Sequence, residues 1–179
     1  MKNLRWIVPA LLLAVAAPGC VLVSGQFLID FELPNFDAST STLVTREDVD
    51  LTTESDYEDH KDDLKGLADV AVLGEITNSG ATNIGVEVWM TAGSTTYLTP
   101  GEVTSGGTRL WGPFKLAPGE KKKVGWDESA KIFDNTGKSL LVNEIKGDGK
   151  FTIYAIADVG TYSFNVDNGV LALVIDFGK

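Results

Sequence analysis

The chain has only one cysteine and one histidine among its 179 residues. The single cysteine, Cys20, excludes an internal disulfide, and the single histidine excludes a histidine-rich zinc site. Catalysis by a Ser-His-Asp or Cys-His group needs an imidazole beside the nucleophile. The lone imidazole, His60, lies among Asp59, Asp62 and Asp63, which is typical of a solvated helix face. We therefore expect no catalytic residue, no cofactor and no enzymatic activity.

Basic side chains are also scarce, with 15 Lys and Arg against 25 Asp and Glu and a net charge of −10. Such a surface repels nucleic acid and anionic lipid headgroups, so we expect no nucleic-acid partner. No expected strand is followed by the glycine pattern of a phosphate loop or of a dinucleotide site, which argues against nucleotide chemistry.

Acidic residues are concentrated in one segment, where nine of the 25 lie between Glu47 and Asp63. Charge runs of this kind usually face water, so a solvated helix face is the favoured interpretation. No calcium loop of the Asp-x-Asp-x-Asp-Gly type is present, and we expect no metal site. A calcium site between the loops of a sandwich would need folding to gather its weak candidates, which are Asp48, Asp50, Asp158 and Asp167.

Residues 1–19 have the three parts of an export signal. Lys2 and Arg5 supply positive charge, residues 6–17 form an apolar run, and small residues follow. Loss of these two basic side chains with the signal changes the net charge from −10 to −12.

The residues before Cys20 carry a family resemblance. Ala17, Gly19 and Cys20 resemble the cleavage site of bacterial lipoproteins, and Pro18 departs from that pattern. The resemblance implies a cut before Cys20 and acylation of its thiol. It also implies a lipid anchor that holds a single domain, residues 20–179, in the cell envelope. We expect an outer-membrane lipoprotein that faces the periplasm or the cell surface.

Three other interpretations compete with lipidation. Ordinary secretion could use a cut after Ala16, which follows the small-x-small rule. An uncleaved anchor over residues 6–23 just reaches the length of a membrane span, but its two prolines and one glycine make it a poor one. Cys20 could also be a buried thiol. Lipidation is favoured because it explains why the only cysteine stands at this place.

Alternating apolar residues predict a mainly β domain, an immunoglobulin-like β-sandwich. Strands are expected at 27–33, 42–51, 70–76, 84–91, 110–116, 121–126 (returning beside 110–116), 151–159 and 170–177. The stretch 92–109 is expected to form a surface loop. Turn residues stand at 78–80, 100–102, 118–120 and 167–169. The strict period of two over 84–91 indicates a sheet with one buried face.

Two regions favour helix. Residues 52–67 have Tyr57, Leu64 and Leu67 at helical spacing, and the run Ser55 to Glu58 reads as a capping box. One or two short helices are expected within 127–147, where Leu141 and Ile145 are one turn apart and Gly147 is a suitable cap.

Residues 74–80, 84–89 and 116–121 resemble immunoglobulin-like and late-embryogenesis-abundant-type sandwich domains of envelope proteins. In those domains a strand ends in an Asn-x-Gly turn, another strand follows, and a Pro-Gly-Glu turn precedes the next. The resemblance covers roughly residues 70–124. It implies the fold and brings no active residues with it.

Aromatic residues provide the candidate binding surface. Trp89 lies opposite the apolar side of its strand, and Tyr97 and Trp111 lie in or beside the polar loop region. Aromatic platforms bind sugars and proteins, although a sandwich layer or the helix at 52–67 could instead cover Trp89, which is the favoured interpretation because large aromatics usually fill cores. The first hypothesis is a non-catalytic envelope adaptor or structural subunit that contacts another envelope protein. The second is a polysaccharide-binding module, and the third, a minor one, is a hydrolase with a carboxylate pair.

Overall fold

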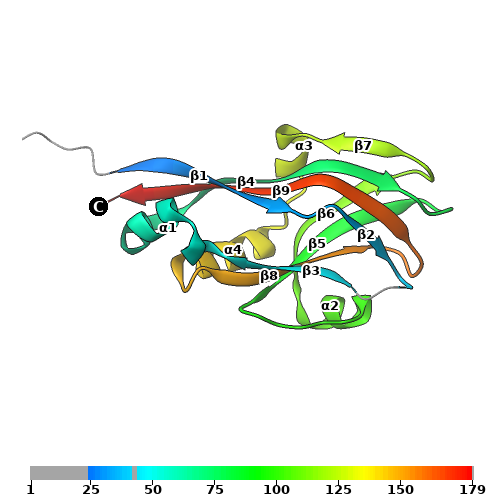
Figure 1. Ribbon diagram of the computed structural model, residues 1–179, viewed down its shortest axis with the longest axis horizontal. Helices are drawn as coiled ribbons and strands as arrows, with labels where there is room; N and C mark the ends of the chain where they lie inside the picture. The colour runs from blue at the N-terminus through cyan, green and yellow to red at the C-terminus, as the bar shows by residue number, and fades with distance from the viewer. Residues whose placement is uncertain (1–23, 42–43, 179) are drawn as a thin grey trace, which may run out of the picture.

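Residues 24–41 and 44–178 are described by the computed structural model, in which two antiparallel sheets pack face to face (Figure 1). The predicted signal and Cys20 lie outside these residues. Sheet A contains, in spatial order, β1 (Ser24–Leu33), β9 (Ser163–Gly178), β4 (Leu64–Asn78) and β7 (Lys121–Val124), with β2 (Phe36–Ser39) also paired to β9. Sheet B contains β3 (Thr45–Asp50), β8 (Lys150–Ala157), β5 (Ile84–Ala92) and β6 (Thr108–Leu116). The prediction of a mainly β sandwich is confirmed.

The core lies between the two sheets and follows the alternation of their strands. Ile29 of β1 is opposite Leu173 of β9, and both side chains are buried. Val86 and Met90 of β5 enter the same layer from sheet B. Each apolar side chain of this size that leaves water contributes about 1.5–3 kcal/mol.

The acidic segment after β3 forms three short helical turns, so the predicted helix over 52–67 is wrong in its extent. The turns are η1 (Leu51–Thr53), α1 (Ser55–His60) and η2 (Lys61–Asp63). Leu64 already begins β4 and pairs with Phe177 of β9, because the ladder of sheet A supplies the hydrogen bonds that further helix would have made. The predicted capping box is wrong too, since Glu54 is the N-cap and makes no side-chain capping bond.

One helix lies between the layers and joins them (Figure 1). α4 (Asn135–Lys146) contacts β4 of sheet A and β5, β6 and β8 of sheet B. Its Leu141 and Ile145 are buried, and the Ile145 carbonyl accepts a 3.0 Å hydrogen bond from the hydroxyl of Tyr57 in α1. With α3 (Trp126–Ala130) and the Gly147 cap, the expectation of short helices within 127–147 is confirmed.

The predicted surface loop over 92–109 contains another helix, α2 (Pro100–Gly106), which lies on the outer side of sheet B (Figure 1). The hydroxyl of Thr99 accepts from the Glu102 backbone, and the Glu102 carboxylate accepts from the Thr99 backbone. The predicted tight turn at 100–102 is therefore wrong, because this capping box and a proline in the first turn start a helix instead.

Both faces of β5 are buried, so the prediction of a single buried face is wrong. On the side away from the core, Glu87 is 5% exposed and Thr91 is 6% exposed. α2 contacts β5 and β6 on that side, and Gly93 and Thr95 of the preceding loop hydrogen-bond to side chains of the neighbouring β8. The alternation of residues within β5 cannot reveal that a loop and a helix from elsewhere in the chain cover its outer side.

Strands that follow each other along the chain often lie in different sheets. The expected turn at 118–120 is present, with Gly119 at φ 71°. β7, however, pairs with β4 in sheet A rather than returning beside β6, so the predicted pairing of 121–126 with 110–116 is wrong. Asn78 stabilises this change of sheet. Its buried amide donates to the Thr82 carbonyl in the β4–β5 connection and to the Leu116 and Ala117 carbonyls where β6 leads into β7, so it joins the two connections.

The last strand is longer than its sequence indicates. β9 begins at Ser163 and not at residue 170, and the expected turn at 167–169 is a bulge inside it. Asn168 has φ 51°, and the register against β4 shifts between Leu73 and Glu75. The same residues suit a bulge and a turn, because both require a left-handed backbone position.

Candidate binding surface

Six apolar side chains share the outer side of sheet A, and we call this surface the sheet A face. They are Leu28, Ala71, Leu73, Val170, Ala172 and Val174. The register places Leu28 beside Val174 and Leu73 beside Val170, with Ala71 beside Ala172 between them. Leu28 is 52% exposed and Leu73, Val170 and Val174 are half-buried, whereas Ala71 and Ala172 are fully buried beneath their neighbours. Apolar side chains that reach the surface side by side, as Leu28 does beside Val174 and Leu73 beside Val170, are typical of contact surfaces.

Carboxylates border the sheet A face. Asp30 and Glu32 stand on β1, Asp69 on β4 and Asp176 on β9, all on the outward side of their strands. Asp30 and Glu32 are exposed, while Asp69 accepts a 2.7 Å hydrogen bond from the indole of Trp126. An apolar centre with an acidic border is the complement of an apolar surface bordered by Lys and Arg.

The edge of sheet A next to this face is formed by β1. Among the described strands, β1 pairs with β9 alone, so its other edge has no strand partner. The carboxylates of Asp30 and Glu32 on this strand discourage indiscriminate pairing of such an edge. The sheet A face is therefore continuous with an edge that a selected partner can reach.

A groove of about 480 Å³ adjoins the face beside the β4–β9 bulge. Half-buried Trp126 lines it together with Glu75, Lys123 and Asn168. Its size is within the range of small-ligand sites, and an indole with a few polar groups is a composition that suits a sugar ring. The register shift between Leu73 and Glu75 of β4 lies beside the groove.

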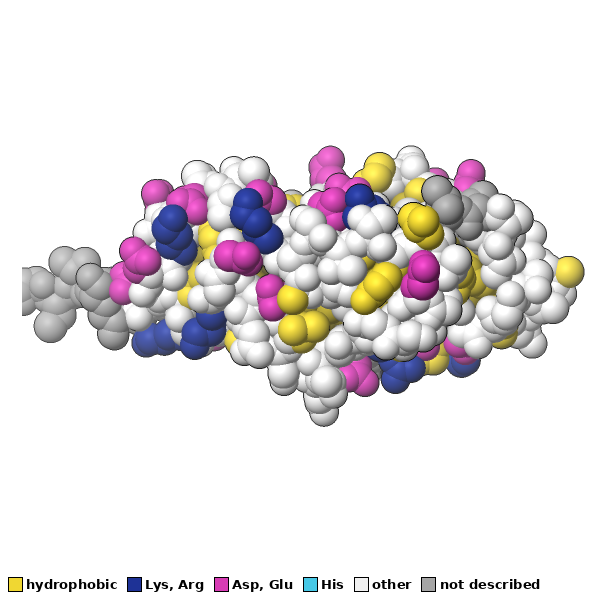
Figure 2. Space-filling view, turned by 90° about the horizontal axis from the view of Figure 1, so that it is seen from below, with side chains coloured by type: hydrophobic (Ala, Val, Ile, Leu, Met, Phe, Trp, Pro, Cys, Tyr) yellow, Lys and Arg dark blue, Asp and Glu magenta, His cyan; other side chains and the backbone are white. Residues whose placement is uncertain are grey.

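The opposite side of the molecule has a different character. Figure 2 shows acidic and basic side chains interspersed there, with hydrophobic ones scattered in small groups.

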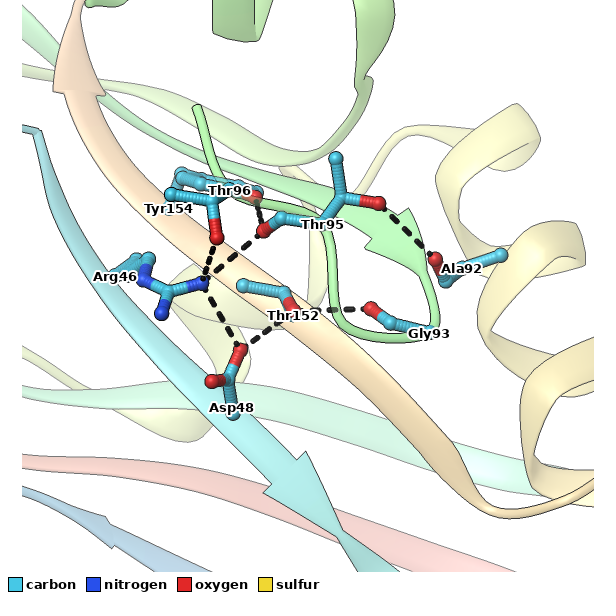
Figure 3. A network of polar contacts seen from close by, with 8 residues as sticks. All are labelled: Arg46, Asp48, Ala92, Gly93, Thr95, Thr96, Thr152 and Tyr154. Carbon is cyan, nitrogen blue, oxygen red and sulfur yellow. Dashed lines mark hydrogen bonds and ion pairs between the residues drawn. The ribbon is translucent and has the colours of Figure 1, made fainter. Parts of the chain in front are cut away.

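A network of polar contacts lies over sheet B (Figure 3), and Tyr97, one of the predicted binding aromatics, packs beside it. Its ring lies 5.7 Å from that of buried Tyr154, whose hydroxyl donates to the Thr95 carbonyl. Arg46 donates to the same carbonyl at 3.2 Å and to the Thr96 hydroxyl at 3.0 Å. These contacts hold the loop before α2 on sheet B, so Tyr97 packs as part of that cover.

Trp89 is half-buried on the same side of sheet B. Its indole donates to Glu87 at 2.9 Å, and Arg109 donates to the other oxygen of that carboxylate at 3.1 Å. Arg109 also lies 3.6 Å from Asp134 at the start of α4. The cover over Trp89 includes the end of α2, since Gly107 lies close to its ring, whereas the segment 52–67 was one of the two covers considered from the sequence.

Trp111 lies in the core, fully buried, so its assignment to a binding surface is wrong. Its indole donates to the backbone carbonyl and the hydroxyl of Ser129 at 3.2 and 3.0 Å. The same hydroxyl accepts a 2.7 Å hydrogen bond from the backbone of Val72 in sheet A. One serine thus connects β6, α3 and β4. The three predicted aromatics therefore do not form a platform.

The weak calcium candidates are engaged separately. Asp50 lies 2.7 Å from Lys150, Asp158 lies 2.6 Å from Lys115, and Asp48 accepts from the Thr152 hydroxyl. The hydrogen bond from Lys150 lowers the pKa of Asp50. Asp167 stands on the bulge of β9. Within residues 24–41 and 44–178 no three His, Cys, Asp or Glu side chains are grouped as a metal site.

His60 is half-buried rather than solvated, which corrects the expectation for this residue. Its ring stacks on Phe177 with 4.0 Å between centroids and lies 5.7 Å from Phe27. The imidazole therefore packs α1 against the ends of β1 and β9.

Leu28 and Trp126 are the two surface residues that the sequence did not single out. Leu28 was visible as the exposed member of an alternating strand, but only pairing in sheet A brings Val174 and Leu73 to the same side. Trp126 begins α3 two residues after the short strand β7, where no period reveals the direction of its side chain.

Among the described residues no helix is long and apolar enough to span a membrane. No protein-family model and no curated protein matches the chain.

Proposed function

We propose that this protein is a lipid-anchored protein of the bacterial envelope whose β-sandwich is a non-catalytic adaptor for another envelope protein. The observation that carries the adaptor role is the sheet A face, with its exposed Leu28 and its border of carboxylates. The partner fitting this surface has apolar side chains flanked by Lys or Arg. The net charge of −10 adds long-range attraction to such a partner.

The anchor is supported by the residues around Cys20 and by the start of the fold. β1 begins at Ser24, only four residues beyond Cys20. A linker of that length spans at most about 14 Å, so an acylated Cys20 holds the sandwich close to the membrane surface.

Intact-mass analysis of protein extracted from membranes tests the anchor. We expect a chain that begins at Cys20 and carries the mass of a diacylglyceryl group, and Cys20→Ser should lack that mass. A mature chain that begins at Ala17 would overturn the anchor in favour of ordinary secretion, without affecting the adaptor surface.

Site-specific photocrosslinking in intact cells tests the adaptor surface. A photoreactive residue replaces Leu28, and the matched control replaces Leu98, which is 48% exposed on the sheet B side. We expect one defined protein to be captured from position 28 and not from position 98. Its crosslinked peptide should lie in an apolar region bordered by basic residues, and Leu73→Glu should reduce capture. Equal capture from both positions, or none, would sink the proposed surface.

Polysaccharide binding is the second candidate, and the groove at Trp126 favours it. A glycan array with tryptophan fluorescence as a second readout tests this function. Binding should be lost in Trp126→Ala and kept in the matched variant Trp89→Phe. Absence of any signal for the wild-type protein would remove this candidate.

A further inference from the structure

A narrow apolar pocket lies between the two sheets. Val72 and Val166 of sheet A form one wall, Val88 and Ile153 of sheet B form the other, and Trp111 stands at the inner end. The free volume inside is about 60 Å³. It is lined almost entirely by hydrocarbon, so ordered water would find too few polar partners there.

The pocket opens between β2 and β3. Its inner residues are buried, whereas Phe36 and Glu47 at this side are half-buried and Pro34 is exposed. β2 pairs with β9 in sheet A and β3 pairs with β8 in sheet B. The described residues show no strand pairing between β2 and β3, so this mouth can widen without breaking a strand ladder.

Shape and chemistry restrict the ligand. The volume is less than half of the roughly 150 Å³ that accommodates benzene in a protein interior, so a rigid ring does not fit. A slender chain fits, with its tip against Trp111 and the rest leaving between the strands. Arg46 and Glu47 both line the mouth, but the guanidinium of Arg46 is bound to Thr95, Thr96 and Asp48. The carboxylate of Glu47 therefore disfavours a carboxylate headgroup there.

We propose that this pocket binds one unbranched alkyl chain whose headgroup is cationic or uncharged, such as the tail of a lipid. The source is a separate molecule. β1 runs ten residues from Ser24 to Leu33, and this strand length places the mouth about 30 Å from the start of the described chain. The pocket is also distinct from the sheet A face, which lies on the outer side of sheet A.

Isothermal titration of the full domain tests the proposal with alkyltrimethylammonium ions below their micellar concentrations. Affinity should rise about fourfold for each added methylene until the pocket is filled and then level off. A branched ion, 3,3-dimethylbutyl-trimethylammonium, should bind at least tenfold more weakly than its linear isomer, hexyltrimethylammonium. Equal binding of linear and branched ions would overturn the proposal.

Two variants locate the site. Ala155→Leu places a larger side chain in the pocket and should reduce affinity for the decyl ion at least tenfold. Glu47→Gln at the mouth should lower the affinity for the decyl cation about threefold to fivefold and raise the affinity for decanoate. This second variant keeps the test decisive if Ala155→Leu fails to fold. Unchanged affinities in a folded Ala155→Leu protein, or in Glu47→Gln, would place any binding elsewhere.

Discussion

Ser129 shows how much of this fold depends on a single side chain. It is fully buried, and its hydroxyl accepts from the indole of Trp111 in sheet B and from the backbone of Val72 in sheet A. Sequence inspection gives no reason to choose this serine among others, because its partners are 18 and 57 residues away.

Replacing this hydroxyl should have a large effect for so small a change. Ser129→Ala should lower the free energy of unfolding by about 1–3 kcal/mol, because the buried Val72 N–H loses its partner. Urea unfolding measures the difference. The matched control is Ser139→Ala, whose exposed hydroxyl donates to the Asn135 carbonyl within α4 and should change stability by less than about 0.5 kcal/mol. Equal losses in the two variants would contradict this role.

At the scale of elements, α4 depends on a close approach to β6. A Cβ added at Gly137 would lie 2.3 Å from the Arg109 carbonyl oxygen and 2.6 Å from the Leu110 Cα. The helix can therefore approach the strand only because this residue has no side chain.

Gly137→Ala should lower the free energy of unfolding by about 1–3 kcal/mol, since the helix or the strand must move. Gly101→Ala in α2 is the matched control, because a Cβ there meets nothing within 4 Å. That variant should be neutral or more stable by about 0.5 kcal/mol. Thermal unfolding of both proteins compares them. A Gly137→Ala protein as stable as wild type would show that α4 does not need this approach.

Asp134, the N-cap of α4, should give the protein a measurable pH dependence. Hydrogen bonds from the backbone of Thr136 and of Gly137, with the nearby Arg109 guanidinium, lower its pKa below the ordinary 3.8. A lowered folded-state pKa contributes stability that is present above 3.8 and is lost as the pH falls through the folded-state value.

Asp134→Asn keeps a capping oxygen but removes the charge, so it tests that sign. The wild type should exceed the variant in stability near neutral pH, and the difference should shrink below about pH 4. Urea unfolding at a series of pH values measures it. A difference independent of pH would refute the electrostatic contribution and leave only the geometric one.

At the scale of elements, some strands and turns could be predicted from the sequence and others could not. Strands with a clear period of two, β1 and β5, were predictable, and so was the turn that contains Gly119. The prediction of one helix over 52–67 failed, because Leu64 and Leu67 match a helical period by coincidence and belong to the first residues of β4, where the strand has already begun. The turn at 167–169 was also wrong, since Asn168 serves a bulge as well as a turn.

At the scale of the whole molecule, one core contains side chains of both sheets and of the helices α1, α2 and α4. Trp111 connects to sheet A through Ser129, and Tyr57 of α1 connects to α4 through the Ile145 carbonyl. We therefore expect a single cooperative unfolding transition. Tryptophan fluorescence and far-ultraviolet circular dichroism should give coincident curves in urea. A fluorescence change that clearly precedes loss of the β signal would contradict a single core.

The sequence by itself determined the fold class and the absence of a second cysteine, because alternation and composition are local properties of the chain. The export signal over residues 1–19 and the lipidation of Cys20 both stay predictions. Only the tertiary structure decided which aromatic side chains are buried. Trp111 lies in the core, and Trp126 lines a surface groove. Pairing across sheet A brings Leu28, Leu73 and Val174 together from three strands, and no local pattern records such a meeting.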